Sequence, residues 1–270
     1  MIGRELREVA LTSAEITQIL TVCGTQALLI GGQSLAFWAL HYQVRPVGVL
    51  SELVTMDVDF VGAAKVAALL KKRLGGQWKL YTASLDDMSG QTAKVYEVLP
   101  DNGLKQVDFL SGIVGLDTRA ANNRAVEVEA DSGLWVRVLH PLDVLESRLQ
   151  NLRQLPSKRN EVGVAQARLA VEVVRAFLED RLAAGNTRRV FQAIKRVKRL
   201  ALSPGLARTA FDYDIDVLAA VPITRIAKTE FQEQFWPDVL SRLKVKHERY
   251  AAKSQSRKAS QNDAGTGAPP

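Results

Sequence analysis

The sequence has little cysteine and no long apolar run, and each absence excludes a class of protein. Cys23 is the single cysteine among 270 residues, which excludes an internal disulfide and a cysteine-rich metal site and fits a reducing cytoplasm. No apolar run reaches the ~18–20 residues of a membrane-spanning helix, and the first residues lack the apolar core of a signal peptide. We therefore expect a cytoplasmic protein with no membrane partner.

Several short catalytic motifs are also missing. The three histidines are scattered, and none has a zinc-site spacing such as His-Glu-x-x-His. The chain contains neither a Gly-x-Ser-x-Gly nucleophile elbow nor a Walker phosphate loop. Candidate chemistry must therefore be sought among other residue types.

Charge is distributed unevenly along the chain. Residues 1–150 hold 14 Lys and Arg against 17 Asp and Glu, a net charge of −3, whereas residues 151–270 hold 22 against 12, a net charge of +10. This asymmetry is expected when one part of a chain performs chemistry and the other attracts a polyanion. A solvated basic helical surface would give the same balance.

The pattern of apolar residues divides the chain into a mixed front part and a helical back part. Short apolar or alternating runs predict strands at 27–30, 55–61, 78–82, 93–99, 105–110, 125–129 and 134–139. After His140 only helical spacing occurs. We predict an α+β protein with a mixed sheet and flanking helices over 1–140 and an all-α domain over 141–253. Residues 254–270 carry no large apolar side chain, which predicts a disordered tail.

A pair of glycines lies where the first predicted buried strand passes into a helix. Because glycine has no Cβ, the backbone N–H groups at Gly31 and Gly32 can approach a phosphate, and the helix N-terminus adds positive potential. Ser34 can donate one further hydrogen bond. A purely structural strand-to-helix turn would have the same sequence, so both interpretations remain open.

Three aspartates lie on predicted strands in a pattern that suits metal ions. Asp57 and Asp59 alternate with apolar residues and therefore point to one side of a strand, roughly 6–7 Å apart at the root. Asp108 supplies a third carboxylate from a later strand, and the three converge if the two strands are neighbours. Such a trio suits two Mg²⁺ ions about 3.5–4 Å apart in phosphoryl chemistry. An exposed acidic strand face is the alternative.

These motifs together resemble those of the polymerase-β-like nucleotidyltransferase superfamily, nearest to AbiEii/AbiGii-type nucleotidyltransferase toxins. The resemblance rests on Leu29-Ile30-Gly31-Gly32-Gln33-Ser34-Leu35-Ala36 and Met56-Asp57-Val58-Asp59-Phe60. It implies a nucleotidyltransferase-like front domain and Mg²⁺-dependent transfer of a nucleotide monophosphate from an NTP to an acceptor hydroxyl. The 25 positions from Gly32 to Asp57 exceed the usual spacing in the family, and the loop over 45–54 would hold the extra chain.

The resemblance also implies a role for individual residues. The implied nucleotide-binding residues are Gly31, Gly32 and Ser34. The implied catalytic and metal-binding residues are Asp57, Asp59 and Asp108. Asp108 would in addition help to activate the attacking hydroxyl. Relatives use a Lys or Arg of the helical part against the triphosphate, for which Lys158 and Arg148 are the candidates. The sequence alone favours a solvated basic turn at this point.

A strongly basic helix is predicted over 187–202. Its cations gather on one side, opposite an apolar face, and no acid interrupts residues 181–211. The candidate nucleic-acid-binding residues are Arg188, Arg189, Lys195, Arg196 and Arg199. They favour tRNA or another RNA as a partner, and the resemblance implies a toxin role with a cognate antitoxin. A catalytically inactive module of the same fold that only binds nucleic acid is the alternative.

Overall fold

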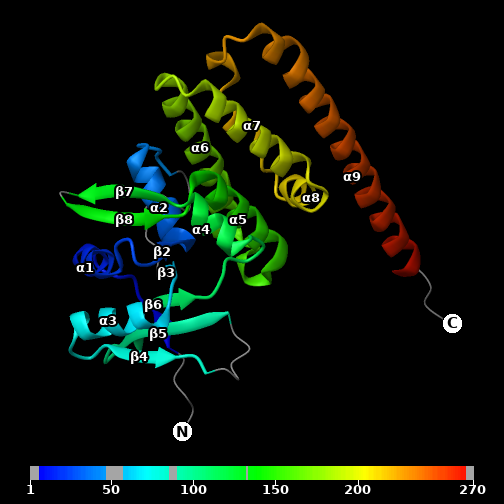
Figure 1. The fold of residues 1–270 in the computed structure, drawn as a ribbon. Helices are drawn as coiled ribbons and strands as arrows, with labels where there is room; N and C mark the ends of the chain where they lie inside the picture. Colours follow the sequence, from blue (N-terminus) through cyan, green and yellow to red (C-terminus); the bar gives the residue numbers. More distant parts are fainter. Residues whose placement is uncertain (1–5, 47–56, 85–89, 132, 266–270) are drawn as a thin grey trace, which may run out of the picture. The chain divides into compact units, whose positions relative to one another are not determined.

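The computed structural model of the chain describes residues 6–46, 57–84, 90–131 and 133–265, with side chains described as far as residue 256 (Figure 1). By their internal contacts the residues divide into two compact units, Met1–Val173 and Val174–Pro270. We call the first the sheet unit and the second the helical unit.

The sheet unit is built on an eight-stranded mixed sheet (Figure 1). Its strands are β1 (Arg7–Glu8), β2 (Leu28–Leu29), β3 (Val58–Val61), β4 (Lys79–Thr82), β5 (Gln91–Val98), β6 (Gly103–Leu110), β7 (Val126–Asp131) and β8 (Leu134–Val138). The order across the sheet is β4-β5-β6-β3-β2-β8-β7, and β1 pairs with β6. The predicted α+β class is confirmed.

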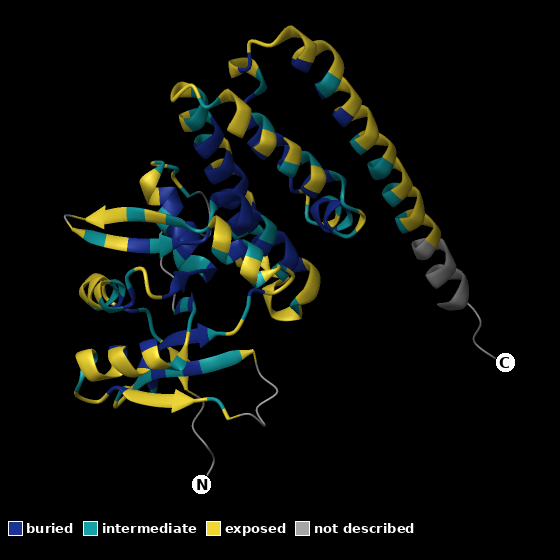
Figure 2. Cartoon of the chain, viewed as in Figure 1, coloured by how far each residue is buried: buried dark blue, intermediate teal, exposed yellow. Residues whose placement is uncertain are grey.

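Strands β3 and β6 lie side by side in the interior of this sheet, and apolar residues of both are buried. They run parallel, whereas β2 runs antiparallel to β3 on its other side. Phe60 and Phe109 are fully buried, and their rings stack with centroids 5.5 Å apart. By contrast, edge strand β4 is exposed along its whole length (Figure 2). The apolar residues of the alternating pattern that predicted β3, Val58 and Phe60, are therefore the ones that hold the strand in the core.

Helices cover the sheet and fix the ends of its strands. They are α1 (Ser13–Cys23), α2 (Gly31–His41), α3 (Ala64–Leu74), α4 (Thr118–Arg124), α5 (Pro141–Gln154), the 3₁₀ turn η2 (Pro156–Lys158) and the start of α6 (Glu161–Ala183). The predicted capping box of Thr12 and Glu15 is present at α1. The indole N–H of Trp38 donates to the carbonyl of Leu139 over 2.7 Å, which ties α2 to the chain before α5.

The observed division of the chain differs from the predicted one. The prediction ended the front domain at residue 140, but α5 packs against α2 and belongs to the sheet unit. Ten of the 14 residues of α5 are buried, and the helix packs against α2 and η2. Helical periodicity identifies α5 as a helix and carries no information about which unit it covers.

The helical unit consists of the end of α6 and helices α7 (Thr187–Leu202), α8 (Pro204–Asp212) and α9 (Trp236–Gly265), joined by η3 (Val217–Ala220), η4 (Ile223–Arg225) and the π-turn η5 (Phe231–Phe235). Helix α9 continues to Gly265, so residues 254–265 are helical where the sequence predicted a disordered tail. Lys, Arg, Gln and Ala in this stretch have good helix propensity, which an argument from missing apolar residues overlooks. Residues 266–270 lie outside the described residues. Within the described part of the chain, no helix combines the length and apolar character that crossing a membrane requires.

Candidate functional site

Three carboxylates gather at the centre of the sheet. Asp57 directly precedes β3, Asp59 lies on β3, and Asp108 lies opposite Asp59 in the parallel register of β6. Asp57 and Asp59 share a face because they are two residues apart on an extended chain. One ligand oxygen from each of the three lies within 4.8 Å of the others. The arrangement brings together the three acids that the sequence singled out, and it can bind a metal ion.

Gly31 lies against this cluster at the start of α2. Its φ of +67° is in the left-handed region, and a Cβ there would come 2.1 Å from Oδ2 of Asp59 and 3.0 Å from its Cβ. The backbone N–H of Ile30 also donates to the carbonyl of Asp59 over 2.9 Å. The glycine is therefore required for space as well as conformation, since it lets the first turn of α2 touch the acid.

The electrostatics of the cluster are those of crowded like charges. Burial, followed by the charges of Asp57 and Asp108, raises the pKa of Asp59 to about 7. Burial also raises the pKa of Asp108. Arg148 and Lys158 act in the opposite direction on the pKa of Asp59, so two cations from the helices after the sheet lie within electrostatic reach of it. A bound divalent cation would relieve the same repulsion.

Strand β5 supplies two partners to Asp108 that the sequence prediction missed. The Nζ of Lys94 lies 3.5 Å from Oδ1 of Asp108, and the amide of Gln91 donates to the same oxygen. Lys94 lies opposite Asp108 in the antiparallel register of β5 and β6, whereas counting outward from the predicted turn at 100–103 would place residue 95 there. Gln91 lies beyond a β-bulge that shifts the register between Gln91 and Ala93, so simple counting does not reach it.

Arg148 on α5 is a buried cation facing this cluster. It is only 7% exposed, one guanidinium nitrogen donates to Oε1 of Gln166 over 3.1 Å, and Nε has no hydrogen-bond partner among the residues that the structure describes. Burial lowers the pKa of Arg148, and the charges of Asp59 and Asp57 raise it. A buried unpaired N–H is costly, which makes this guanidinium available to an anionic ligand.

The remaining predicted nucleotide-binding residues lie around the same point. Gly31 and Gly32 form the first turn of α2, whose leading N–H groups have no partner within the helix. The hydroxyl of Ser34 is fully buried and donates to the carbonyl of Gly31 over 2.9 Å. Ser34 therefore holds the turn together in this structure. Lys158 ends η2 with its side chain exposed.

The raised pKa of Asp59 predicts how the stability of the metal-free protein depends on pH. Between about pH 4 and the folded-state pKa of about 7, folded Asp59 holds a proton that the unfolded chain has lost, so stability falls as the pH rises. We expect the free energy of unfolding in EDTA to be lower at about pH 8 than at about pH 5. Asp59→Asn should flatten this slope and stabilise the protein at the higher pH. Urea denaturation followed by circular dichroism measures the free energy of unfolding at each pH. The same pH dependence in Asp59→Asn and wild type would contradict a raised pKa of Asp59.

The predicted nucleic-acid-binding residues all lie on α7 in the helical unit. Arg188, Arg189, Lys195 and Arg199 are exposed, and Arg196 is half-buried. Val190, Ile194, Val197 and Leu200 are buried on the opposite face. The predicted amphipathic helix is thus confirmed, while its ligand remains a prediction.

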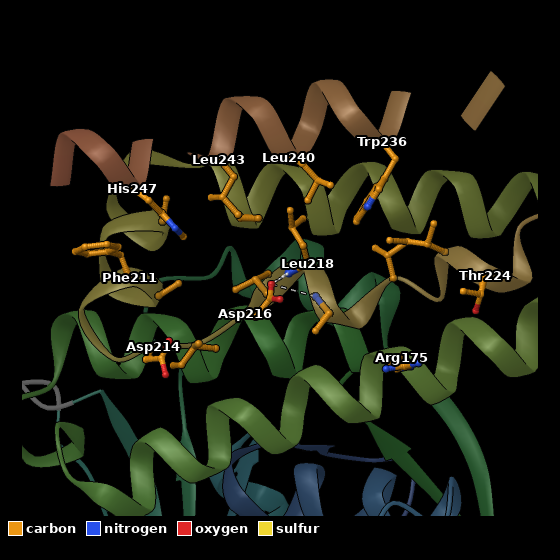
Figure 3. Close-up of a pocket in the computed structure, with 18 residues that line it drawn as sticks. Arg175, Phe211, Asp214, Asp216, Leu218, Thr224, Trp236, Leu240, Leu243 and His247 are labelled. Atoms are coloured by element: carbon orange, nitrogen blue, oxygen red, sulfur yellow. Dashed lines mark hydrogen bonds between the residues drawn. The ribbon is translucent and has the colours of Figure 1, made fainter. Parts of the chain in front are cut away.

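The helical unit also contains a cavity of about 700 Å³ with mostly apolar walls. Leu240 and Leu243 of α9 face Leu218 of η3 across it (Figure 3). Two of its polar side chains already have structural roles. Asp216 caps η3 by accepting from the N–H of Leu218 over 3.0 Å, and Arg175 pairs with Glu179. These two side chains are therefore engaged within the helical unit.

Comparison with known proteins gives distant structural similarity. No protein-family model matches the chain, and no curated protein matches it. The structure is similar to that of JHP933 from Helicobacter pylori, with 13% identity and a TM-score of 0.38 over 92% of this chain and 95% of that one. It is also similar to a nucleotidyltransferase candidate from H. pylori, with 12% identity and a TM-score of 0.39 over 90% of this chain and 94% of that one.

Proposed function

We propose that the protein is a Mg²⁺-dependent nucleotidyltransferase, which transfers a nucleotide monophosphate from an NTP to an acceptor hydroxyl. The observation that carries the proposal is the convergence of Asp57, Asp59 and Asp108 within 4.8 Å beside the first turn of a helix. A metal-binding acid cluster and a helix N-terminus are the two elements needed to hold a triphosphate at a metal centre.

The donor set fits Mg²⁺. All three side chains offer hard carboxylate oxygens, which magnesium prefers over nitrogen and sulfur. Their crowding, visible in the raised pKa of Asp59, is the electrostatic signature of a site that gains by taking up a cation. We propose two ions, as in other two-metal phosphoryl-transfer sites. When bound, they would polarise the phosphate and stabilise the charge that develops on the attacking and leaving oxygens.

The other residues have definable roles in this scheme. The N–H groups at Gly31 and Gly32 would orient the triphosphate, and Arg148 would neutralise part of its charge from its buried position. Asp108 would accept the proton of the acceptor hydroxyl. The acceptor oxygen then forms a bond to the α-phosphorus while the bond to the bridging oxygen breaks, and pyrophosphate leaves with that electron pair. Lys158 is a second cation for the phosphates.

RNA is the acceptor that we favour. Helix α7 offers exposed cations without intervening acids, and such a surface attracts phosphates. A tRNA or another RNA end would supply the hydroxyl. A role as the toxin of a toxin–antitoxin pair, with a cognate antitoxin as partner, extends the same proposal.

A second candidate function is a binding module without catalysis. The observation in its favour is that the cations of α7 lie in a different unit from the acid cluster and need no metal to attract nucleic acid. Binding that persists in EDTA, together with no transfer, would support this candidate.

Incubation with α-labelled nucleotides tests the two functions. We expect wild-type protein to move label onto RNA in Mg²⁺ and not in EDTA. Without a bound cation, the negative carboxylates repel the negative triphosphate. Each of the four NTPs is tried with total tRNA, with protein and with the chain itself as acceptor. Label on none of these in any condition would contradict the enzyme proposal for those acceptors.

A further inference from the structure

We infer that the helical unit binds single-stranded nucleic acid through a base-stacking pocket beside the basic face of α7. This inference rests on the RNA acceptor of the proposed function and gives it a specific binding site. The pocket is formed by Phe191, Ile194, Lys195, Lys228, Glu230, Phe231 and Phe235. None of these residues belongs to the acid cluster.

The walls of this pocket are aromatic and partly open. Phe231 is buried at its base, and Phe235 stacks on it with ring centroids 5.3 Å apart. Phe191 meets Phe231 edge-on at 5.5 Å. Phe191 and Phe235 are only half-buried. Because Phe235 also has the Nζ of Lys198 4.7 Å from its ring centroid, Phe191 is the ring that we assign to stacking. The pocket volume of about 260 Å³ lies just below the ~300–1,000 Å³ of drug-sized ligand sites, which suits a single planar ring system.

The positive charges beside the pocket favour binding of a negatively charged chain. Arg188, Lys195 and Arg199 follow each other at helical spacing along the exposed centre of α7. Among the described residues, no ion pair engages any of these three cations. Lys195 itself lines the pocket, so the row of cations passes its mouth. The only acid in the lining, Glu230, is paired with Lys228 at 3.3 Å.

Aromatic rings beside a row of unpaired cations are the combination that single strands require. Stacking uses the face of any base, while the cations follow the phosphates. A duplex hides its base faces, so it would engage the cations alone. The pocket therefore predicts a preference for single strands, which a basic surface without aromatic rings would not give.

Fluorescence anisotropy with a labelled oligouridine tests the inference on the full chain. We expect Phe191→Leu to weaken binding about tenfold or more, because it keeps the apolar volume and removes the stacking face. Phe191→Trp should restore it. Arg188→Glu, Lys195→Glu and Arg199→Glu combined should abolish binding, while neutralising the same residues with Gln should reduce the salt slope by about two. The control is Lys71→Glu, Lys72→Glu and Arg73→Glu, three exposed cations on α3.

Further measurements keep the result interpretable if a variant misfolds. Lys228→Glu alters an exposed side chain at the pocket and should also weaken binding. In a separate experiment, an oligonucleotide carrying 4-thiouridine should crosslink to Phe191 or Phe235. Wild-type binding of the oligonucleotide should persist in EDTA, so a failed transfer assay does not count against the pocket. Equal affinity of Phe191→Leu and wild type, equal affinity for duplex and single strand, or crosslinks elsewhere would overturn the inference.

Discussion

Asp57→Asn and Asp59→Asn should each slow nucleotide transfer by at least about a thousandfold. A metal site of this kind supplies several kcal/mol of transition-state stabilisation, and about 4 kcal/mol corresponds to that factor in rate. Asparagine keeps the size of the side chain and removes the charge that holds the cation. The rate of label transfer at saturating NTP and Mg²⁺ measures the effect.

Glu127→Gln is the matched control for these variants. Glu127 is an exposed acid on β7 of the same sheet, so the substitution makes the same chemical change away from the cluster. It should leave the rate unchanged. The Asp variants should also lose the increase in melting temperature that Mg²⁺ gives to the wild type. Transfer by Asp59→Asn at the wild-type rate would refute a metal-binding role for Asp59.

Gly31→Ala should cost both stability and activity. The added Cβ would come 2.1 Å from Oδ2 of Asp59 and 2.9 Å from its Cγ. The carboxylate cannot avoid it by rotating its tip alone, because the Cβ of Asp59 is also only 3.0 Å away. Overpacking of this kind costs ~1–3 kcal/mol, in addition to ~1–2 kcal/mol for a non-glycine residue in the left-handed region. Urea denaturation and label transfer measure the two losses.

Gly75→Ala separates the two contributions. Gly75 has a φ of +64°, close to the +67° of Gly31, but nothing lies within 4 Å of a Cβ built on it. It should therefore show only the conformational cost and keep full activity. If the two variants were equally stable and equally active, the close contact between Gly31 and Asp59 would have no consequence.

Local signals in the sequence predicted much of what surrounds the site. Alternation identified β3, and the burial of Val58 and Phe60 confirms which face it turns inward. The capping box marked the start of α1, and the turn at 100–103 marked the hairpin of β5 and β6. These features depend on residues close in sequence, which is why single-sequence reasoning reaches them.

From the sequence alone, the three acids converge only if their two strands are neighbours, and the sequence does not say whether they are. The convergence depends on β3 pairing with β6 in one parallel register, which places Asp59 beside Asp108. No local pattern specifies a contact between strands separated by two other strands and a helix. The hydrogen bond of buried Arg148 to Gln166 and the contact of Gly31 with Asp59 likewise join residues that are distant in the sequence. The apolar spacing of α5 looks the same whether the helix covers a sheet or joins a bundle, so the sequence does not indicate that α5 lies in the sheet unit.

The alternation along β3 has a consequence for folding errors. If β3 paired with its neighbours one residue out of step, Asp59 would turn into the apolar layer and Phe60 would turn towards water. Such a slip would be penalised twice, by a desolvated charge and by an exposed ring. Chains with a misaligned β3 should therefore fail to reach a stable native state, so that a population of folded molecules without the acid cluster does not accumulate.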